Sequence, residues 1–389
     1  MASCPFGYGS SHADEGDGSS SNVPPLGDGG IYYSDYLGLD KLLTAQNPES
    51  TKAGKPAHDE MLFIIVHQTY ELWFKQILHE LDSIIGIFSQ ASIPEKDLTL
   101  VIHRMKRIDE IQRILIAQIS VLETMHPLDF LDFRKFLTPA SGFQSFQFRV
   151  LENKLGIKAK QRFQLQKTEY LGYFKAHHQE VLRGSEKVSL LELVQRWLER
   201  TPFLEFEGWS FLVEYKNTVT RMHEEDREAV LADQHTTEEH KQQQLKMIEQ
   251  TLLQFQSLFD EEKHNELVAQ GFRRISFRAL QAALLISLYR DEPLLSTPFQ
   301  LLTLLLQMDE NISLWRYRHT QMVHRMLGSK VGTGGSSGYR YLKSTTSDRY
   351  KVFLDFYNLS SFLIPRSNLP DLPVEAKSKL GFYYSSHTQ

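Results

Sequence analysis

Residues 313–327, with the sequence SLWRYRHTQMVHRML, form the stretch around which the rest of this 389-residue chain is organised. The pattern predicts a helix, and one face of it carries the residues that lie three, four or seven positions from His319. These are Ile312, Trp315, Arg316, Met322, Val323 and Met326. The imidazole therefore sits in an apolar, aromatic-edged stripe. Such a histidine is either a hydrogen-bonded core residue or an axial ligand of a flat apolar cofactor.

A glycine-rich loop, residues 328–338 with the sequence GSKVGTGGSSG, follows this helix directly. It lacks the lysine of a phosphate-binding P-loop and does not follow a predicted strand, so nucleotide binding is not expected. Two interpretations stay open. The loop is either a simple connector or a flap that closes over a pocket and offers backbone groups and the hydroxyl of Thr333.

The overall composition is that of an ordinary globular protein, with 41% hydrophobic and 23% charged residues. A formal net charge of −5 argues against nucleic acid or an anionic membrane surface as the main partner. The single cysteine, Cys4, excludes a disulfide framework, a thiolate metal site and covalent haem attachment. We expect no secretory signal and no membrane span, and therefore a cytosolic protein.

A second histidine lies near the start of a long predicted helix, residues 60–90. The run MLFIIV at 61–66 is apolar on all sides, which predicts that this helix passes through the centre of the fold. His67 follows immediately, with Phe63, Tyr70 and Phe74 on its face. It is either a second core histidine or a second functional one.

A short predicted helix, residues 128–137, carries a possible anion-binding side chain. Phe130 and Arg134 lie one turn apart on it, so an aromatic ring stands beside a guanidinium. An arginine on such a face needs an anionic partner, which is either a structural carboxylate or the carboxylate of a ligand. Ser141 and Gly142 follow this helix. The preceding segment, 95–122, shows only the periodicity of a core helix.

The remaining sequence predicts an all-α protein, because strand-type alternation is almost absent. We expect a disordered tail at 1–28, an N-terminal arm at 29–53, a helical domain at 54–366 and a C-terminal tail at 367–389. The charge-rich segment 158–273 is interpreted as an outer helical insertion. The arm has an apolar patch that contains Tyr32, Tyr33, Tyr36, Leu37 and Leu39. This patch packs either on its own core or on another subunit.

Six blocks of the sequence together resemble the tryptophan 2,3-dioxygenase family, over about residues 31–365. The blocks are HQTYELWFKQI at 67–77, PLDFLDFR at 127–134, PASGFQS at 139–145, WRYRH at 315–319, GTGGSSG at 332–338 and SDRYKVF at 347–353. The resemblance implies a large helical bundle around a haem pocket. It also implies a homotetramer, a dimer of dimers, in which Tyr33, Tyr36 and Leu37 of the arm complete the substrate site of a neighbouring subunit.

The resemblance further implies a haem b enzyme with a noncovalent cofactor and His319 as the proximal ligand of its ferrous iron. The reaction inserts both atoms of O2 across the indole C2–C3 bond of L-tryptophan and gives N-formyl-L-kynurenine, the first step of the kynurenine pathway. Implied cofactor contacts are Trp315, Ser141 and Gly142. Implied substrate contacts are His67 to the indole N–H, Arg134 to the carboxylate, Thr333 to the ammonium, and Phe63 and Phe130 as walls of the indole site.

Three alternatives remain at this stage. A broader indoleamine dioxygenase would share most of the site. A noncatalytic haem carrier or gas sensor would need His319 and an apolar pocket, but neither Arg134 beside Phe130 nor a closing loop. A helical scaffold would use both histidines as core residues and would bind no haem.

Overall fold

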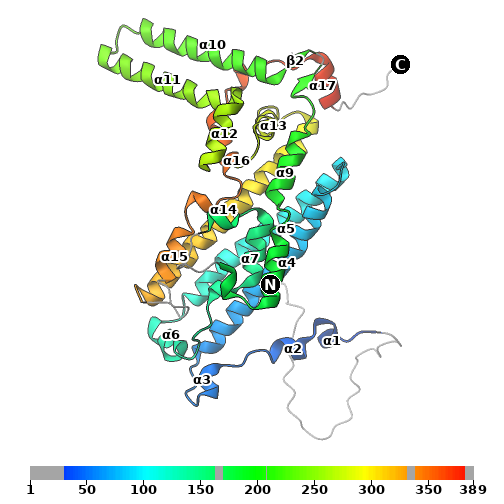
Figure 1. The fold of residues 1–389 in the computed structure, drawn as a ribbon, viewed down its shortest axis with the longest axis vertical. Coiled ribbons are helices and arrows are strands. Elements are labelled where there is room, and N and C mark those ends of the chain that lie inside the picture. Colours follow the sequence, from blue (N-terminus) through cyan, green and yellow to red (C-terminus); the bar gives the residue numbers. More distant parts are fainter. Residues whose placement is uncertain (1–29, 163–169, 207, 331–337, 382–389) are drawn as a thin grey trace, which may run out of the picture. The chain divides into compact units, whose positions relative to one another are not determined.

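The computed structural model describes residues 30–162, 170–206, 208–330 and 338–381. The chain divides into two compact units, Met1–Asn47 and Pro48–Gln389. Nearly all regular structure in the described residues is helical, which confirms the all-α prediction (Figure 1). The exception is a two-stranded antiparallel sheet of β1 (Glu205–Phe206) and β2 (Trp209–Ser210).

The first unit contains two short helices, α1 (Tyr33–Leu37) and α2 (Leu39–Leu43). The α-helices of the second unit are α3 (Glu49–Lys52), α4 (Asp59–Phe88), α5 (Glu95–Leu122), α6 (Pro127–Arg134), α7 (Phe146–Leu155), α8 (Ala176–Ser185), α9 (Leu190–Glu199), α10 (Phe211–Ala232), α11 (Glu238–Phe259), α12 (Glu261–Gln270), α13 (Phe277–Leu288), α14 (Pro293–Leu327), α15 (Gly338–Ser344), α16 (Leu354–Asn358) and α17 (Val374–Leu380). Single turns of 3₁₀ helix are η1 (Gly142–Gln144), η2 (Ala159–Gln161), η3 (Tyr170–Tyr173), η4 (Asp348–Tyr350), η5 (Leu359–Phe362) and η6 (Arg366–Asn368).

Three long helices, α4, α5 and α14, form the frame of the second unit (Figure 1). Helix α5 packs against both of the others because its apolar residues recur at helical spacing. The residues of this predicted stripe are all buried: Leu98, Ile102, Met105, Ile108, Ile111, Leu115 and Ile119. Burying a leucine or isoleucine side chain stabilises a fold by roughly 1.5–3 kcal/mol, so each residue of this stripe stabilises the packing of α5.

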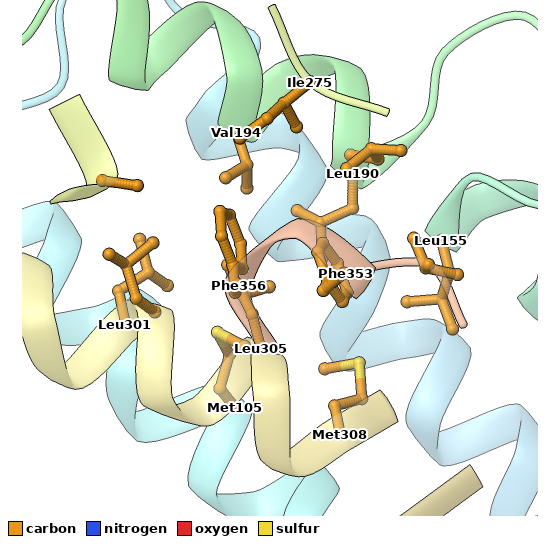
Figure 2. Packing of buried hydrophobic residues seen from close by; sticks show 14 of the residues in the cluster. Met105, Leu155, Leu190, Val194, Ile275, Leu301, Leu305, Met308, Phe353 and Phe356 are labelled. Atoms are coloured by element: carbon orange, nitrogen blue, oxygen red, sulfur yellow. The ribbon is translucent and has the colours of Figure 1, made fainter. Parts of the chain in front are cut away.

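The core beneath α14 also draws on segments that are far apart in the sequence. Figure 2 shows Met105 of α5, Val194 of α9 and Leu305 of α14 pointing toward Phe356 of α16. All four side chains are buried.

The α9 helix begins with a capping box, in which the Ser189 hydroxyl accepts from the Glu192 backbone N–H at 3.3 Å.

Helix α4 was predicted to lie centrally, and the structure shows that only one side of it does. Val66 is buried, but Met61 is 40% exposed and Ile65 is 44% exposed in this chain. Among the described residues, no single helix is long and apolar enough to cross a membrane, and the one pair that passes such a test together, α5 and α6, is bent by 90° at its break.

Two predicted boundaries are wrong. The pair Thr297–Pro298 has the pattern of a helix cap followed by a first helical residue and predicts a helix start there, but α14 begins at Pro293 and Pro298 lies inside it. The spacing of Tyr350, Phe353, Phe356 and Leu359 predicts helix over 339–366, but this segment consists of short turns and helices. Its periodic residues Phe353 and Phe356 are nevertheless buried. In this segment the sequence therefore predicted which residues are buried, but it did not predict where the helix is interrupted.

The predicted domain boundaries stay predictions, but two observations bear on them. Within the predicted outer insertion, 158–273, helix α9 packs against α4 and α13 and its Leu190 is fully buried. Within the predicted C-terminal tail, 367–389, helix α17 buries Ala376 and Leu380.

Candidate active site

A cavity of about 320 Å³ lies among α4, α6, α7 and α14. The structure brings most of the predicted site residues together around it: Phe63, His67, Phe130, Arg134, Ser141, Gly142, Trp315 and His319 all line the cavity. Thr333 lies outside the described residues. Tyr33, Tyr36 and Leu37 belong to the first unit, where all three are exposed.

His319 is presented to the cavity by the second half of α14. The Trp315 ring, one turn earlier, stacks on the imidazole with the ring centroids 5.0 Å apart and an angle of 10° between the planes. Burial, with a smaller contribution from His67, lowers the pKa of His319 to about 4. The imidazole is therefore neutral at pH 7 and keeps a lone pair for a metal ion.

The surroundings of His319 discriminate between the two interpretations of its stripe. A core histidine is normally hydrogen-bonded, because an unpaired buried polar atom is costly. No hydrogen bond to His319 is formed within the part of the chain that the structure describes. Its ring instead contributes to the cavity wall. This arrangement favours a ligand over a structural histidine.

His67 faces the same cavity from α4. Its Nδ1 lies 2.7 Å from the backbone carbonyl oxygen of Phe63. Because a carbonyl can only accept, Nδ1 carries the proton, and Nε2 of the neutral ring is left as an acceptor. Burial lowers the pKa of His67, while the Phe63 carbonyl and Glu71 oppose this change. His67 is exposed by its solvent-accessible area in this chain and also lines the cavity.

Aromatic rings and a guanidinium form the wall next to His67. The ring centroids of Phe63 and His67 are 4.1 Å apart, and those of Phe63 and Phe130 are 5.6 Å apart. Helix α6 holds Phe130 and Arg134 one turn apart and packs against both α4 and α14. Its first turn is set by Pro127 at N1 and by His126 Nδ1, which accepts from the Leu128 N–H at 3.2 Å.

Sequence reasoning missed several polar residues of the cavity wall. Glu71, Arg149, Glu152 and Tyr341 all line it. Glu71 lies one turn after His67 and accepts from the Gln147 amide at 2.8 Å. For Glu71 the sequence did contain a signal, because this residue lies one helical turn after His67. No local signal marked the other three, because they meet α14 only in the folded chain.

Comparison with known proteins identifies the family. A family model described as tryptophan 2,3-dioxygenase matches residues 18–363. The chain belongs to the tryptophan 2,3-dioxygenase family. A tryptophan 2,3-dioxygenase of Dictyostelium discoideum is 50% identical over 357 residues, which cover 92% of this chain and 89% of that protein.

Relatives from distant organisms are similar over nearly their whole length. The tryptophan 2,3-dioxygenase of Bdellovibrio bacteriovorus is 48% identical, with 91% of this chain and 99% of that protein covered. The tryptophan 2,3-dioxygenase of Rattus norvegicus is 47% identical, with 96% of this chain and 94% of that protein covered. The family resemblance predicted from the six sequence blocks is thereby confirmed.

The family generally depends on haem, and the described cavity suits that group. The neutral imidazole of His319 has no hydrogen-bond partner in the described residues, so a ring nitrogen is available to bind a metal ion. Phe74, Ile119 and Leu122 give the cavity apolar walls. A buried polar atom, Arg149 Nε, also lacks a hydrogen-bond partner among the residues that the structure describes. These features fit a flat apolar group with charged substituents.

Proposed function

We propose that this chain binds haem b noncovalently through His319 and catalyses the oxidative cleavage of L-tryptophan to N-formyl-L-kynurenine, the first step of the kynurenine pathway. The observation that carries the proposal is that one cavity unites His319, His67, Phe130 and Arg134. Family membership supports it. We further propose the cytosol as its compartment, because a single cysteine suits a reducing setting.

In this proposal the haem, when bound, activates O2 for insertion across the indole C2–C3 bond, and the protein binds and orients the substrate. Arg134 binds the tryptophan carboxylate through a bidentate pair. Phe63 and Phe130 pack against the indole ring. His67 accepts the indole N–H at Nε2, the nitrogen that its bond to Phe63 leaves unprotonated. Thr333 is proposed to bind the ammonium group. Enclosure of the substrate excludes water and fixes the reacting carbon atoms.

The proposal is tested by an absorption spectrum of the purified protein with and without L-tryptophan, followed by product analysis under O2. We expect a histidine-ligated haem spectrum that changes on tryptophan binding, and one N-formylkynurenine for each O2 consumed. A red protein that binds O2 but forms no product would instead be a carrier or sensor. A colourless protein that binds no added haem would be a scaffold.

A broader indoleamine dioxygenase is not favoured, because Arg134 lies beside Phe130 at the wall of the cavity. A guanidinium at that place selects for a substrate with a carboxylate. Comparing L-tryptophan with tryptamine, which lacks the carboxylate, separates the two activities.

Replacing His67 with Ala is expected to reduce kcat/KM while leaving measurable turnover. An indole N–H is a very weak acid, so a neutral imidazole serves as its hydrogen-bond acceptor and not as an obligatory base. Loss of one hydrogen bond costs roughly 1–3 kcal/mol, which corresponds to about a 5- to 150-fold reduction. Steady-state kinetics on haem-replete protein measure this. Complete inactivity with intact haem and unchanged tryptophan affinity would show that His67 is an obligatory base.

We also propose that the enzyme is a homotetramer whose arms complete neighbouring sites. Tyr33 is 57% exposed, Tyr36 is 72% exposed and Leu37 is 45% exposed, which is unusual for a row of apolar side chains in a lone chain. The second unit has exposed apolar residues as well. Ile65 and Leu72 lie seven residues apart on one face of α4, and both are more than 40% exposed. Such surfaces are typical of subunit interfaces.

If the arm acts in trans, two inactive variants should complement each other. Tyr36→Ala would lack the arm contact, and His319→Ala would lack the haem ligand. A mixed oligomer contains a subunit with intact haem that receives an intact arm from its His319→Ala neighbour. Activity is therefore expected to exceed the average of the two parents after co-expression.

The experiment requires separately tagged subunits, so that mixed oligomers are purified through both tags before assay. Mixed oligomers that are no more active than the average of their parents would place the arm in cis.

A further inference from the structure

Three arginines surround one glutamate beside the cavity. Arg149 Nη1 donates to Glu152 at 2.9 Å, and Arg316 Nη2 donates to it at 2.6 Å. Arg162 Nη1 donates to the same carboxylate. All four residues are at most 8% exposed. Burial alone would raise the pKa of Glu152, but the three guanidinium groups outweigh this effect and hold the pKa well below its usual range.

The cluster has more positive than negative charge. Among the described residues, a further carboxylate that interacts with the cluster is Asp309, two turns before Arg316 on α14. It already accepts from the backbone N–H groups of Val352 at 3.0 Å and Phe353 at 2.9 Å, and burial raises its pKa. Within the described part of the chain, three guanidinium groups therefore donate to the single carboxylate of Glu152, and Asp309, when ionised, is shared with Arg274. An excess buried charge is unfavourable unless an anion accompanies it.

One side of this cluster borders the cavity. Arg149, Glu152 and Arg316 line it, together with Tyr341 of α15. Arg149 Nη2 donates to the Tyr341 hydroxyl oxygen at 3.2 Å, and Arg149 Nε is buried with no partner in the described part of the chain. Because the Tyr341 oxygen accepts from a cation, its own proton is a strengthened donor. That proton has no acceptor among the described residues.

We infer that Arg149 and Tyr341 form a binding site for a carboxylate of the porphyrin, that is, for a haem propionate. The inference rests on the proposed function, since haem b is the group that would bring carboxylates into this cavity. Glu152 has a different role as a positioning residue, because it fixes the Arg149 guanidinium through Nη1. The substrate carboxylate is assigned elsewhere, to Arg134 on α6, so the two anions are bound by separate arginines.

The test compares haem b with its dimethyl ester, in which both carboxylates are blocked. Wild-type protein and Arg149→Met are each reconstituted with either porphyrin, and haem loss to an excess of apomyoglobin is followed in the Soret region. A charge-assisted hydrogen bond corresponds to roughly a tenfold to hundredfold change in affinity. Wild type is expected to lose the ester faster than haem b by about this factor. Arg149→Met is expected to lose both at a similar fast rate.

Two further variants make the result specific. Arg273 is about as buried as Arg149, at 7% exposure, but it does not line the cavity. The Arg273→Met variant should therefore keep the wild-type preference for haem b over its ester. Tyr341→Phe removes only the hydroxyl and should weaken that preference even if Arg149→Met does not fold.

The outcomes separate this inference from the function on which it rests. Wild-type protein that holds haem b and its ester equally well, or an Arg149→Met variant with the full wild-type preference, would overturn the carboxylate site and leave the dioxygenase proposal standing. Wild-type protein that takes up no haem would overturn both.

Discussion

Replacing His319 with Ala is expected to give a folded protein that retains no histidine-ligated haem and has no dioxygenase activity above background. The His319 imidazole is neutral at pH 7, borders the cavity and lacks a hydrogen-bond partner in the described residues. Removing it from the cavity wall breaks no hydrogen bond there, so the fold should persist. Circular dichroism reports the fold, and the ratio of Soret to protein absorbance reports haem content.

The control is His67→Ala, which removes the other imidazole of the same cavity. It should keep both haem content and the histidine-ligated spectrum, because Nδ1 of His67 is bound to the Phe63 carbonyl and its role is assigned to the substrate. Free imidazole added to His319→Ala should restore part of the spectrum by entering the space left by the side chain. If His67→Ala loses haem and His319→Ala keeps it, the axial assignment is reversed.

The fold was predictable where a stretch of sequence decides its own conformation. Helical periodicity identified α5, and a glycine directly after a helical run, the usual sign of a helix end, stands where α7 ends. That glycine, Gly156, has φ +135°, and a Cβ there would lie 2.9 Å from the Leu191 Cβ, so no other residue fits without a shift. Continuous helix over 339–366 was wrong because a distant group intervenes. The Asp309 carboxylate accepts the N–H groups of Val352 and Phe353, which are then not available to a helix.

The residues of the candidate site also fall into those that the sequence could pair and those that it could not. His67 with Phe63, and Phe130 with Arg134, lie within one turn of each other, so the sequence places each pair on one helix face. Partners that are distant in sequence gave no such signal. Arg316 and Glu152 form a buried ion pair across 164 positions, and Arg149 meets Tyr341 across 192. Periodicity placed Arg316 in the stripe of His319, but its partner was visible only in the structure.

Replacing Arg134 with Leu is expected to lower kcat/KM for L-tryptophan by about two to four orders of magnitude while haem content stays unchanged. Loss of one partner of a desolvated ion pair costs roughly 3–5 kcal/mol, most of it from the carboxylate left without its guanidinium. Leucine fills much of the same volume and keeps the helix propensity of α6. The haem spectrum should therefore be that of the wild type, and steady-state kinetics should show the loss.

Tryptamine decides whether this loss comes from the carboxylate. It has the indole and the ammonium group but no carboxylate, so its slow turnover should be nearly the same in Arg134→Leu and in the wild type. Lys135→Leu is the matched control. Lys135 is exposed at the end of α6 and does not line the cavity, so this substitution also removes one positive charge but should leave the turnover of both substrates unchanged. Equal losses for L-tryptophan and tryptamine in Arg134→Leu would mean that the guanidinium supports the structure of the cavity, and the substrate carboxylate would then need another partner.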